Sequence, residues 1–264
     1  MKDCIHFVHG NGFPSGCYRQ LLTPLQSYFD IRVIDRVGHT SEFPVTDNWH
    51  YLVDEVIHSV RTQSRTPVIA VGHSLGGILS WLAAVLEPTL FTAVILLDSP
   101  LIGPVRSNMI RLSKKLGIID HVTPAYRVKG RRKHWHNKEE VLAYLKSRPL
   151  FKFFTEECLY DYIDYGMDQS DIGYSLRFDT HIEYQIYRTI PHILHEYEGK
   201  SCRPTALIYG DNSNVVNMLD VWYMQNNHDV KAYKTKGTHM FPMEHPLSAA
   251  GLLMQVIDEI RCHS

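Results

Sequence analysis

Short apolar runs alternate with amphipathic stretches along most of the chain. The runs are hydrophobic at nearly every position, which is typical of strands buried on both faces of a parallel sheet. Between them, apolar residues recur with helical spacing, as in the segment 52–60. The pattern predicts an α/β fold whose mostly parallel sheet has about six strands, with helices on both faces. The predicted strands are 4–8, 31–35, 68–71, 93–97, 205–209 and 229–234.

Residues 101–200 interrupt this alternation, because they show helical patterns without a clear parallel-strand signal. An insertion between two strands of one parallel sheet leaves from their carboxyl ends, the edge at which ligands bind. We therefore expect one core formed by 1–100 and 201–264, with 101–200 as a helical cap over the site. The helices predicted in the cap are 105–116, 138–147, 155–165 and 182–197.

The strand at 68–71 runs into the sequence Gly72-His73-Ser74-Leu75-Gly76-Gly77, and a helix-forming stretch follows at once. A Gly-x-Ser-x-Gly turn between strand and helix is typical of a nucleophile elbow. Such a turn strains the backbone at Ser74, and only small neighbours such as Gly72 and Gly76 tolerate it. It would present the hydroxyl beside the free N–H groups at the start of the helix.

Two further polar turns follow predicted strands. The first strand ends in His9-Gly10-Asn11-Gly12, where glycines allow the backbone to approach a ligand closely. The last strand is followed by a loop that carries His239 just before the final helix.

With these three motifs in this order, the chain resembles an α/β-hydrolase. The resemblance implies that Ser74 is the nucleophile and His239 the general base. It also implies that the backbone N–H groups of Leu75 and Asn11 form the oxyanion hole, with Gly12 as the alternative to Asn11. A serine hydroxyl needs a base to take its proton, and the developing oxyanion needs donors already in place.

The sequence departs from the family pattern in two places. Most members begin with two additional strands, for which we expect no room here. The family generally carries its acid three residues after the glycine that ends the strand at 205–209, and this position is Ser213. We expect Asp98, at the tip of the strand at 93–97, to take the role of the acid, with Asp211 as the alternative.

Composition excludes several other classes of protein. The chain has 264 residues, 44% of them hydrophobic, and a net charge of -1, so it offers no overall field for nucleic acid. It contains no apolar run long enough to span a membrane, and because the first predicted strand begins early we expect no secretory signal. The cysteines are odd in number and scattered, which is typical of reduced thiols in a cytoplasmic protein. They are Cys4, Cys17, Cys158, Cys202 and Cys262.

We expect a cofactor-free serine hydrolase without a metal site, acting on a small-molecule ester or thioester of a small to medium, fairly apolar acid. The same triad is also compatible with an acyltransferase, a perhydrolase or a C–C bond hydrolase, and the fold with a non-catalytic binding protein. A basic run, Lys129–Lys133, fits a solvated turn of the cap, a phosphate- or carboxylate-bearing substrate, or an anionic membrane surface. The oligomeric state does not follow from the sequence.

Overall fold

A computed structural model describes residues 2–201 and 203–261, and these form a six-stranded sheet in the order β2-β1-β3-β4-β8-β9. Every pair of neighbouring strands in it is parallel. The predicted α/β class and the mostly parallel six-stranded sheet are confirmed. The strands are β1 (Cys4–Val8), β2 (Asp30–Val33), β3 (Val68–His73), β4 (Phe91–Leu97), β8 (Thr205–Gly210) and β9 (Val230–Thr235).

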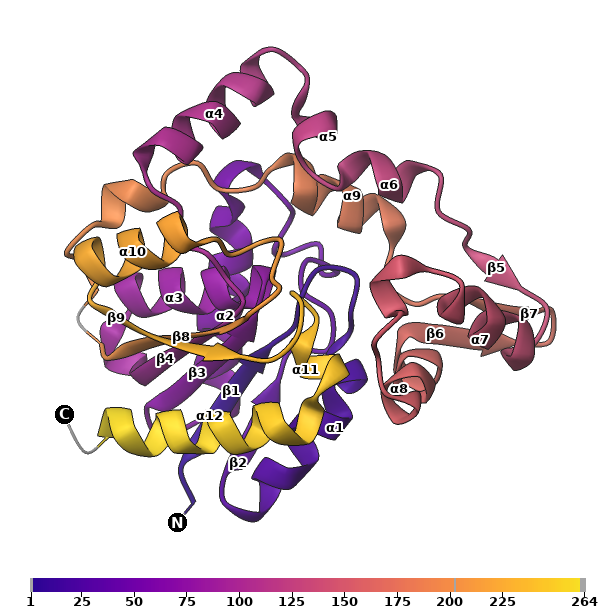
Figure 1. Ribbon diagram of the computed structural model, residues 1–264, viewed down its shortest axis with the longest axis horizontal. Coiled ribbons are helices and arrows are strands. Elements are labelled where there is room, and N and C mark those ends of the chain that lie inside the picture. Colours follow the sequence, from indigo (N-terminus) through magenta and orange to yellow (C-terminus); the bar gives the residue numbers. More distant parts are fainter. Residues whose placement is uncertain (1, 202, 262–264) are drawn as a thin grey trace.

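Both faces of the sheet are covered by helices, and strand β3 shows why its sequence is apolar throughout (Figure 1). Its residues Val68 and Ala70 belong to the hydrophobic cluster that contains side chains of α2, α3 and α10. The alternate residues Ile69 and Val71 belong to the cluster that contains side chains of α1 and α12. The helices of the core are α1 (Arg19–Leu22), α2 (His50–Gln63), α3 (Leu75–Leu86), α10 (Met218–Asn227), α11 (Phe241–Glu244) and α12 (Pro246–Arg261).

The strand order reverses direction between β1 and β3, since β2 lies on one side of β1 and the later strands lie on the other. In open parallel sheets, a ligand binds outside the carboxyl ends of the strands at such a switch point. The turn after β1 and the turn after β3 therefore lie at the edge of the sheet where ligands bind in folds of this kind.

Between β4 and β8, which are neighbours in the sheet, the chain makes a long excursion that we call the inserted segment, residues 101–200. Figure 1 shows it extending away from the core sheet, above and beside the carboxyl ends of the strands. Its helices are α4 (Pro104–Lys115), α5 (Ile119–Val122), α6 (Ala125–Lys129), α7 (Lys138–Lys146), α8 (Glu156–Gly166) and α9 (Thr180–Arg188).

The inserted segment also holds a small antiparallel sheet in the order β5-β7-β6, which the sequence did not predict. Its strands are β5 (His134–Trp135), β6 (Met167–Ser170) and β7 (Gly173–Leu176). They are too short and too mixed in polarity to show a period of two.

One predicted helix ends earlier than expected. The pattern at 182–197 predicted a continuous helix, but α9 ends at Arg188 and a separate 3-10 turn covers Leu194–Tyr197. Pro191 explains the break, because proline lacks the N–H that would continue the helix and clashes with the preceding turn.

Three cysteines, Cys4, Cys17 and Cys158, are free and buried. Burial raises the pKa of each of these thiols, which makes them poor nucleophiles. The remaining two, Cys202 and Cys262, lie outside the described residues. Across residues 2–201 and 203–261, none of the helices combines the length and the apolar composition needed to cross a bilayer.

Candidate active site

Ser74 occupies the sharp turn between β3 and α3, with backbone angles φ 53° and ψ -115°. A non-glycine residue in this region is strained, and the surrounding backbone must hold it there. The two glycines explain how the turn closes. A Cβ atom on Gly72 would lie 2.3 Å from the carbonyl carbon of Gly76, and one on Gly76 would lie 2.1 Å from the carbonyl oxygen of Val8. Strand, turn and helix therefore meet at distances that only glycine permits.

Helix α3 begins at Leu75, directly after Ser74. The first N–H groups of a helix have no partner within the helix, and they carry its positive dipole end. Leu75 is buried, so its N–H is removed from bulk water. The position has the properties expected of one donor of an oxyanion hole.

The turn after β1 provides the second set of candidate donors. The N–H of Phe13 donates to the carbonyl of Gly10 at 3.1 Å, and Gly12 has φ 81°, as the third position of a type II turn requires. In the described part of the chain, the backbone N–H groups of Asn11 and Gly12 donate to no protein acceptor. The Asn11 side chain is held by the inserted segment, since its Nδ2 donates to the carbonyl oxygen of Glu183 at 3.0 Å. Both Asn11 and Gly12 thus stay candidates for the second donor.

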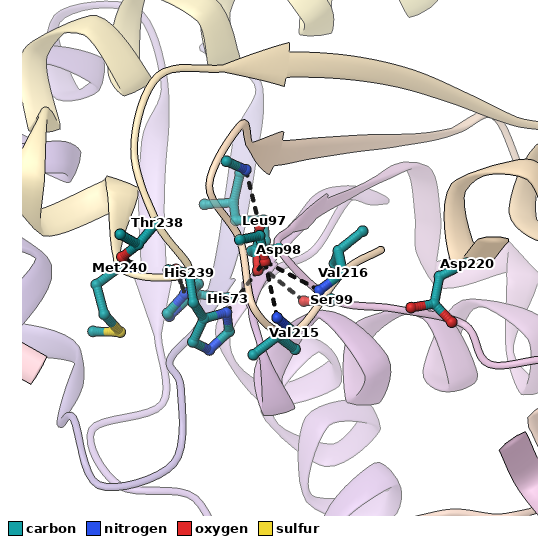
Figure 2. A network of polar contacts seen from close by, with 12 residues as sticks. His73, Leu97, Asp98, Ser99, Val215, Val216, Asp220, Thr238, His239 and Met240 are labelled. Atoms are coloured by element: carbon teal, nitrogen blue, oxygen red, sulfur yellow. Dashed lines mark hydrogen bonds and ion pairs between the residues drawn. The ribbon is translucent and has the colours of Figure 1, made fainter. Parts of the chain in front are cut away.

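Asp98 follows β4 with φ 47° and is completely buried. Its Oδ2 lies 2.7 Å from Nδ1 of His239, and its Oδ1 accepts a hydrogen bond from the N–H of Gly210 at 2.9 Å. Figure 2 shows the imidazole of His239, from the loop after β9, beside this carboxylate at the tip of β4. A carboxylate bound to Nδ1 fixes the tautomer of the ring and leaves Nε2 as the base.

Ser213, the position at which the family generally carries its acid, contacts Asp98 directly. Its hydroxyl donates to Oδ2 of Asp98 at 2.6 Å and accepts hydrogen bonds from the N–H groups of Val215 and Val216. The alternative acid, Asp211, is used differently: its Oδ1 accepts a hydrogen bond from the N–H of Gly237 at 2.9 Å. The geometry favours Asp98 over Asp211, and both roles stay predictions until activity is measured.

A hydrogen-bonded chain joins the turn after β1 to the loop of His239. The N–H of Gly10 donates to the hydroxyl of Tyr18 at 3.0 Å, and this hydroxyl lies 2.7 Å from Nδ1 of His73. Nε2 of His73 lies 2.9 Å from the carbonyl oxygen of His239. Because a carbonyl only accepts, Nε2 of His73 carries the proton and Nδ1 accepts from Tyr18.

His73 is the residue before Ser74, and its ring centroid lies 4.8 Å from that of His239. Figure 2 shows the two rings side by side. Burial, assisted by the neighbouring imidazole of His239, lowers the pKa of His73 to about 3. His73 is therefore neutral at physiological pH and acts as a fixed hydrogen-bond bridge rather than as a base.

A profile of the alpha/beta hydrolase family matches residues 7–250. The chain belongs to this family. The prediction of an α/β-hydrolase, made from the three sequence motifs, is confirmed.

Individual proteins similar to this α/β-hydrolase match a smaller part of it. The monoglyceride lipase homolog of monkeypox virus is 37% identical over 111 residues, which are 39% of this chain and 40% of that protein. The monoglyceride lipase of Rattus norvegicus is 36% identical over 110 residues, which are 38% of this chain and 36% of that protein. The chain thus spans 40% or less of the length of these two relatives.

Among solved structures, E-2-(acetamidomethylene)succinate hydrolase has a TM-score of 0.79 at 20% sequence identity, covering 98% of this chain and 92% of the other. At this identity the likeness describes the fold. Its coverage extends over the inserted segment as well as the core.

Sequence reasoning missed several residues that hold this α/β-hydrolase site together. Tyr18 and His73 form the bridge described above, and Ser213 binds the candidate acid. The carboxylate of Glu244 accepts from the N–H of Thr238 at 2.8 Å and from its hydroxyl, which fixes the backbone before His239. His73 carried a signal, because a histidine inside the elbow motif is polar where the strand is otherwise apolar. Tyr18 and Glu244 carried none.

The inserted segment packs on the turn after β1. A Cβ atom on Gly12 would lie 2.8 Å from Oε1 of Glu183, so the carboxylate rests directly on that turn. Arg131 binds both oxygens of Glu183, at 3.0 and 2.8 Å, and also donates to the hydroxyl of Tyr162. Phe13 packs against the rings of three aromatic residues of the segment. They are Phe151, Phe154 and Tyr162.

Proposed function

We propose that this chain is a cofactor-free serine hydrolase that cleaves a carboxylic ester or thioester of a small to medium, fairly apolar acid. Ser74 is the proposed nucleophile, His239 the general base and Asp98 the acid that orients it. The observation that carries this proposal is the 2.7 Å contact between Nδ1 of His239 and Oδ2 of Asp98. A buried carboxylate bound to Nδ1 of a histidine is the arrangement that a serine triad requires of its acid and base.

In the proposed reaction, Oγ of Ser74 attacks the carbonyl carbon while Nε2 of His239 takes its proton. The oxyanion that forms accepts hydrogen bonds from the N–H of Leu75 and that of Asn11 or Gly12. His239 then gives the proton to the departing alcohol or thiol, and an acyl-enzyme remains. Water, deprotonated by the same imidazole, cleaves the acyl-enzyme and restores Ser74.

The surroundings of Asp98 support its role as the acid that orients His239. Three donors surround the carboxylate: the N–H of Gly210, the hydroxyl of Ser213 and the ring of His239. In the proposed triad, this carboxylate stabilises the imidazolium that His239 becomes when it takes the proton from Ser74.

The names of the relatives add one class of compound to the substrates worth testing. Two of them carry the name monoglyceride lipase, which describes an enzyme acting on an ester of glycerol with one acyl chain. We therefore include a monoglyceride beside simple esters and thioesters as candidate substrates.

The test uses p-nitrophenyl esters of graded chain length, a matching panel of acyl-CoA thioesters and a monoglyceride. We expect hydrolysis of at least one of these classes by the wild type and none above background by Ser74→Ala. Ser80→Ala is the matched control, because Ser80 lies on the same helix, is completely buried and has no partner for its hydroxyl among the described residues. Ser80→Ala should keep the wild-type rate. Equal rates for Ser74→Ala and the wild type would refute the proposal.

A further inference from the structure

Helix α4, the first helix of the inserted segment, buries two serines and exposes a row of apolar side chains to solvent. The side chains on its buried face are Ser107, Ile110 and Ser113, two of which are hydroxyls bonded to nearby carbonyl groups. Its exposed face is apolar, although a surface helix normally buries its apolar side. The exposed residues, with their exposed fractions, are Val105 (78%), Met109 (65%), Leu112 (56%) and Leu116 (63%).

These four residues, which we call the α4 stripe, follow one another at intervals of four, three and four positions. Residues at such intervals lie on one side of a helix, so the stripe is continuous along the whole length of α4. The chain that follows α4 extends this apolar surface, because Ile118, Val122 and Tyr126 are also half exposed. Contiguous apolar surface of this kind marks an interaction site in soluble domains.

The same part of the chain is strongly basic. Residues 104–133 hold nine of the 27 Lys and Arg residues and one of the 28 Asp and Glu residues, while the whole chain has a net charge of -1. Positive charge is therefore concentrated around the exposed apolar surface. The nine are Arg106, Arg111, Lys114, Lys115, Arg127, Lys129, Arg131, Arg132 and Lys133.

Several of these cations already have carboxylate partners within the protein. In the basic run, Lys129 pairs with Asp120, Arg131 with Glu183 and Arg132 with Glu140. The run therefore has little charge left for an anionic substrate.

On α4, Arg106 pairs with Asp220 and Lys114 with Asp47. Two further cations of this helix, Arg111 and Lys115, form no ion pair with any described residue. Figure 1 places α4 at the outer edge of the molecule, with no other element covering its outer side.

A partner for this surface must offer an apolar interior and negative charge over the length of one helix. An anionic bilayer offers both, since aliphatic side chains enter the acyl boundary while Lys and Arg meet the headgroups. Protein interfaces are enriched in aromatic side chains, Met and Arg and depleted in Lys, whereas the α4 stripe has no aromatic residue and has Lys115 beside it. We propose that α4 docks this chain on the surface of membranes that contain anionic phospholipids.

The test measures co-sedimentation with vesicles of phosphatidylcholine alone and of phosphatidylcholine mixed with phosphatidylglycerol. We expect the wild type to bind the mixed vesicles, to bind them less as salt is raised, and to bind the neutral vesicles weakly. Met109→Ser combined with Leu112→Ser should weaken binding by at least about tenfold. Arg111→Ser combined with Lys115→Ser should weaken it by at least about fivefold.

Leu247→Ser is the matched control, because Leu247 is a similarly exposed leucine on α12, a helix that Figure 1 shows at the opposite side of the molecule from α4. It should leave binding unchanged, and so should Ser74→Ala, which separates membrane docking from catalysis. The α4 variants should keep wild-type hydrolysis of a water-soluble ester. Absence of vesicle binding by the wild type, equal binding to both vesicle types, or unchanged binding by the α4 variants would each overturn the proposal. If vesicles are not bound and the α4 stripe instead mediates dimerisation, the proposal is also overturned. The same holds if the stripe instead binds an acidic protein.

Discussion

His239 and Asp98 come from loops that follow two different strands of one sheet, and Nδ1 of the histidine lies 2.7 Å from Oδ2 of the aspartate. The alternative acid, Asp211, instead accepts a hydrogen bond from the backbone N–H of Gly237. The two acids therefore hold different parts of the same loop, the ring in one case and its backbone in the other.

Because Asp98 binds the ring of His239 and Asp211 binds the backbone of its loop, we predict different effects of two matched substitutions. Asp98→Asn should lower kcat by about 10⁴-fold, because an amide at this position stabilises the wrong tautomer of His239 and no longer offsets the imidazolium charge. Asp211→Asn keeps an oxygen that can accept from Gly237, so its kcat should stay within about tenfold of the wild type. The measurement is kcat on the best ester of the panel, with circular dichroism to show that both variants are folded. A large loss in Asp211→Asn alone would reverse the assignment.

The bridge through Tyr18 gives a prediction about stability. Tyr18→Phe removes the hydroxyl that accepts from Gly10 and donates to His73, and it leaves both of these buried groups unpaired. The free energy of unfolding should fall by about 2–4 kcal/mol, as measured by urea denaturation. Tyr28→Phe is the matched control, because Tyr28 is 63% exposed and should tolerate the change. Equal stability of the two variants would show that the bridge contributes nothing.

The elbow predicts a contrast between two glycines. In Gly76→Ala the new Cβ atom would lie 2.1 Å from the carbonyl oxygen of Val8, a clash of one backbone segment with another. We expect this variant to lose several kcal/mol of stability or to fail to fold, as overpacking of a rigid site implies. Gly251→Ala on α12 meets nothing within 4 Å and should gain about 0.5–1 kcal/mol. Thermal unfolding of the two variants measures the contrast, and a stable Gly76→Ala variant would contradict the described packing.

A buried histidine away from the site predicts how stability changes with pH. Burial lowers the pKa of His6 to about 4 in the folded protein, whereas an unfolded histidine titrates near 6.5. Between these values the unfolded chain binds a proton that the folded chain does not, so His6 makes the protein less stable as the pH falls from about 6.5 to about 4. His6→Gln should remove this contribution, which amounts to roughly 2 kcal/mol at pH 5. Urea denaturation at pH 7, 6 and 5 should give a flatter pH dependence for His6→Gln, and parallel curves would disprove the role of His6.

The sequence was sufficient to predict those elements whose residue types are explained by local structure alone. Apolar runs such as the one at β3 predicted buried parallel strands, and the glycines around Ser74 predicted the elbow, because only glycine tolerates those backbone distances. The serine at position 213 indicated that the acid had to come from elsewhere, and the structure places Asp98 within hydrogen-bonding distance of both Ser213 and His239.

The features that the sequence could not reveal depend on contacts between distant segments. Tyr18 and His73 are 55 positions apart, and nothing in the local sequence of either residue predicts their contact. Helical spacing predicted α4, but periodicity alone does not say which side of a helix is buried, so its exposed apolar face was not anticipated. The short strands β5, β6 and β7 pair only because the inserted segment brings them together.

Covalent labelling of the wild type with a fluorophosphonate probe tests the central claim, which is that Ser74 is an activated nucleophile. The labelled residue is identified by peptide mass spectrometry, and Ser74→Ala and Ser80→Ala serve as the paired variants. We predict a single phosphonylated residue, Ser74, with labelling lost in Ser74→Ala, retained in Ser80→Ala and strongly slowed in Asp98→Asn. Folded wild-type protein that does not react, or that reacts at another residue, would contradict the account.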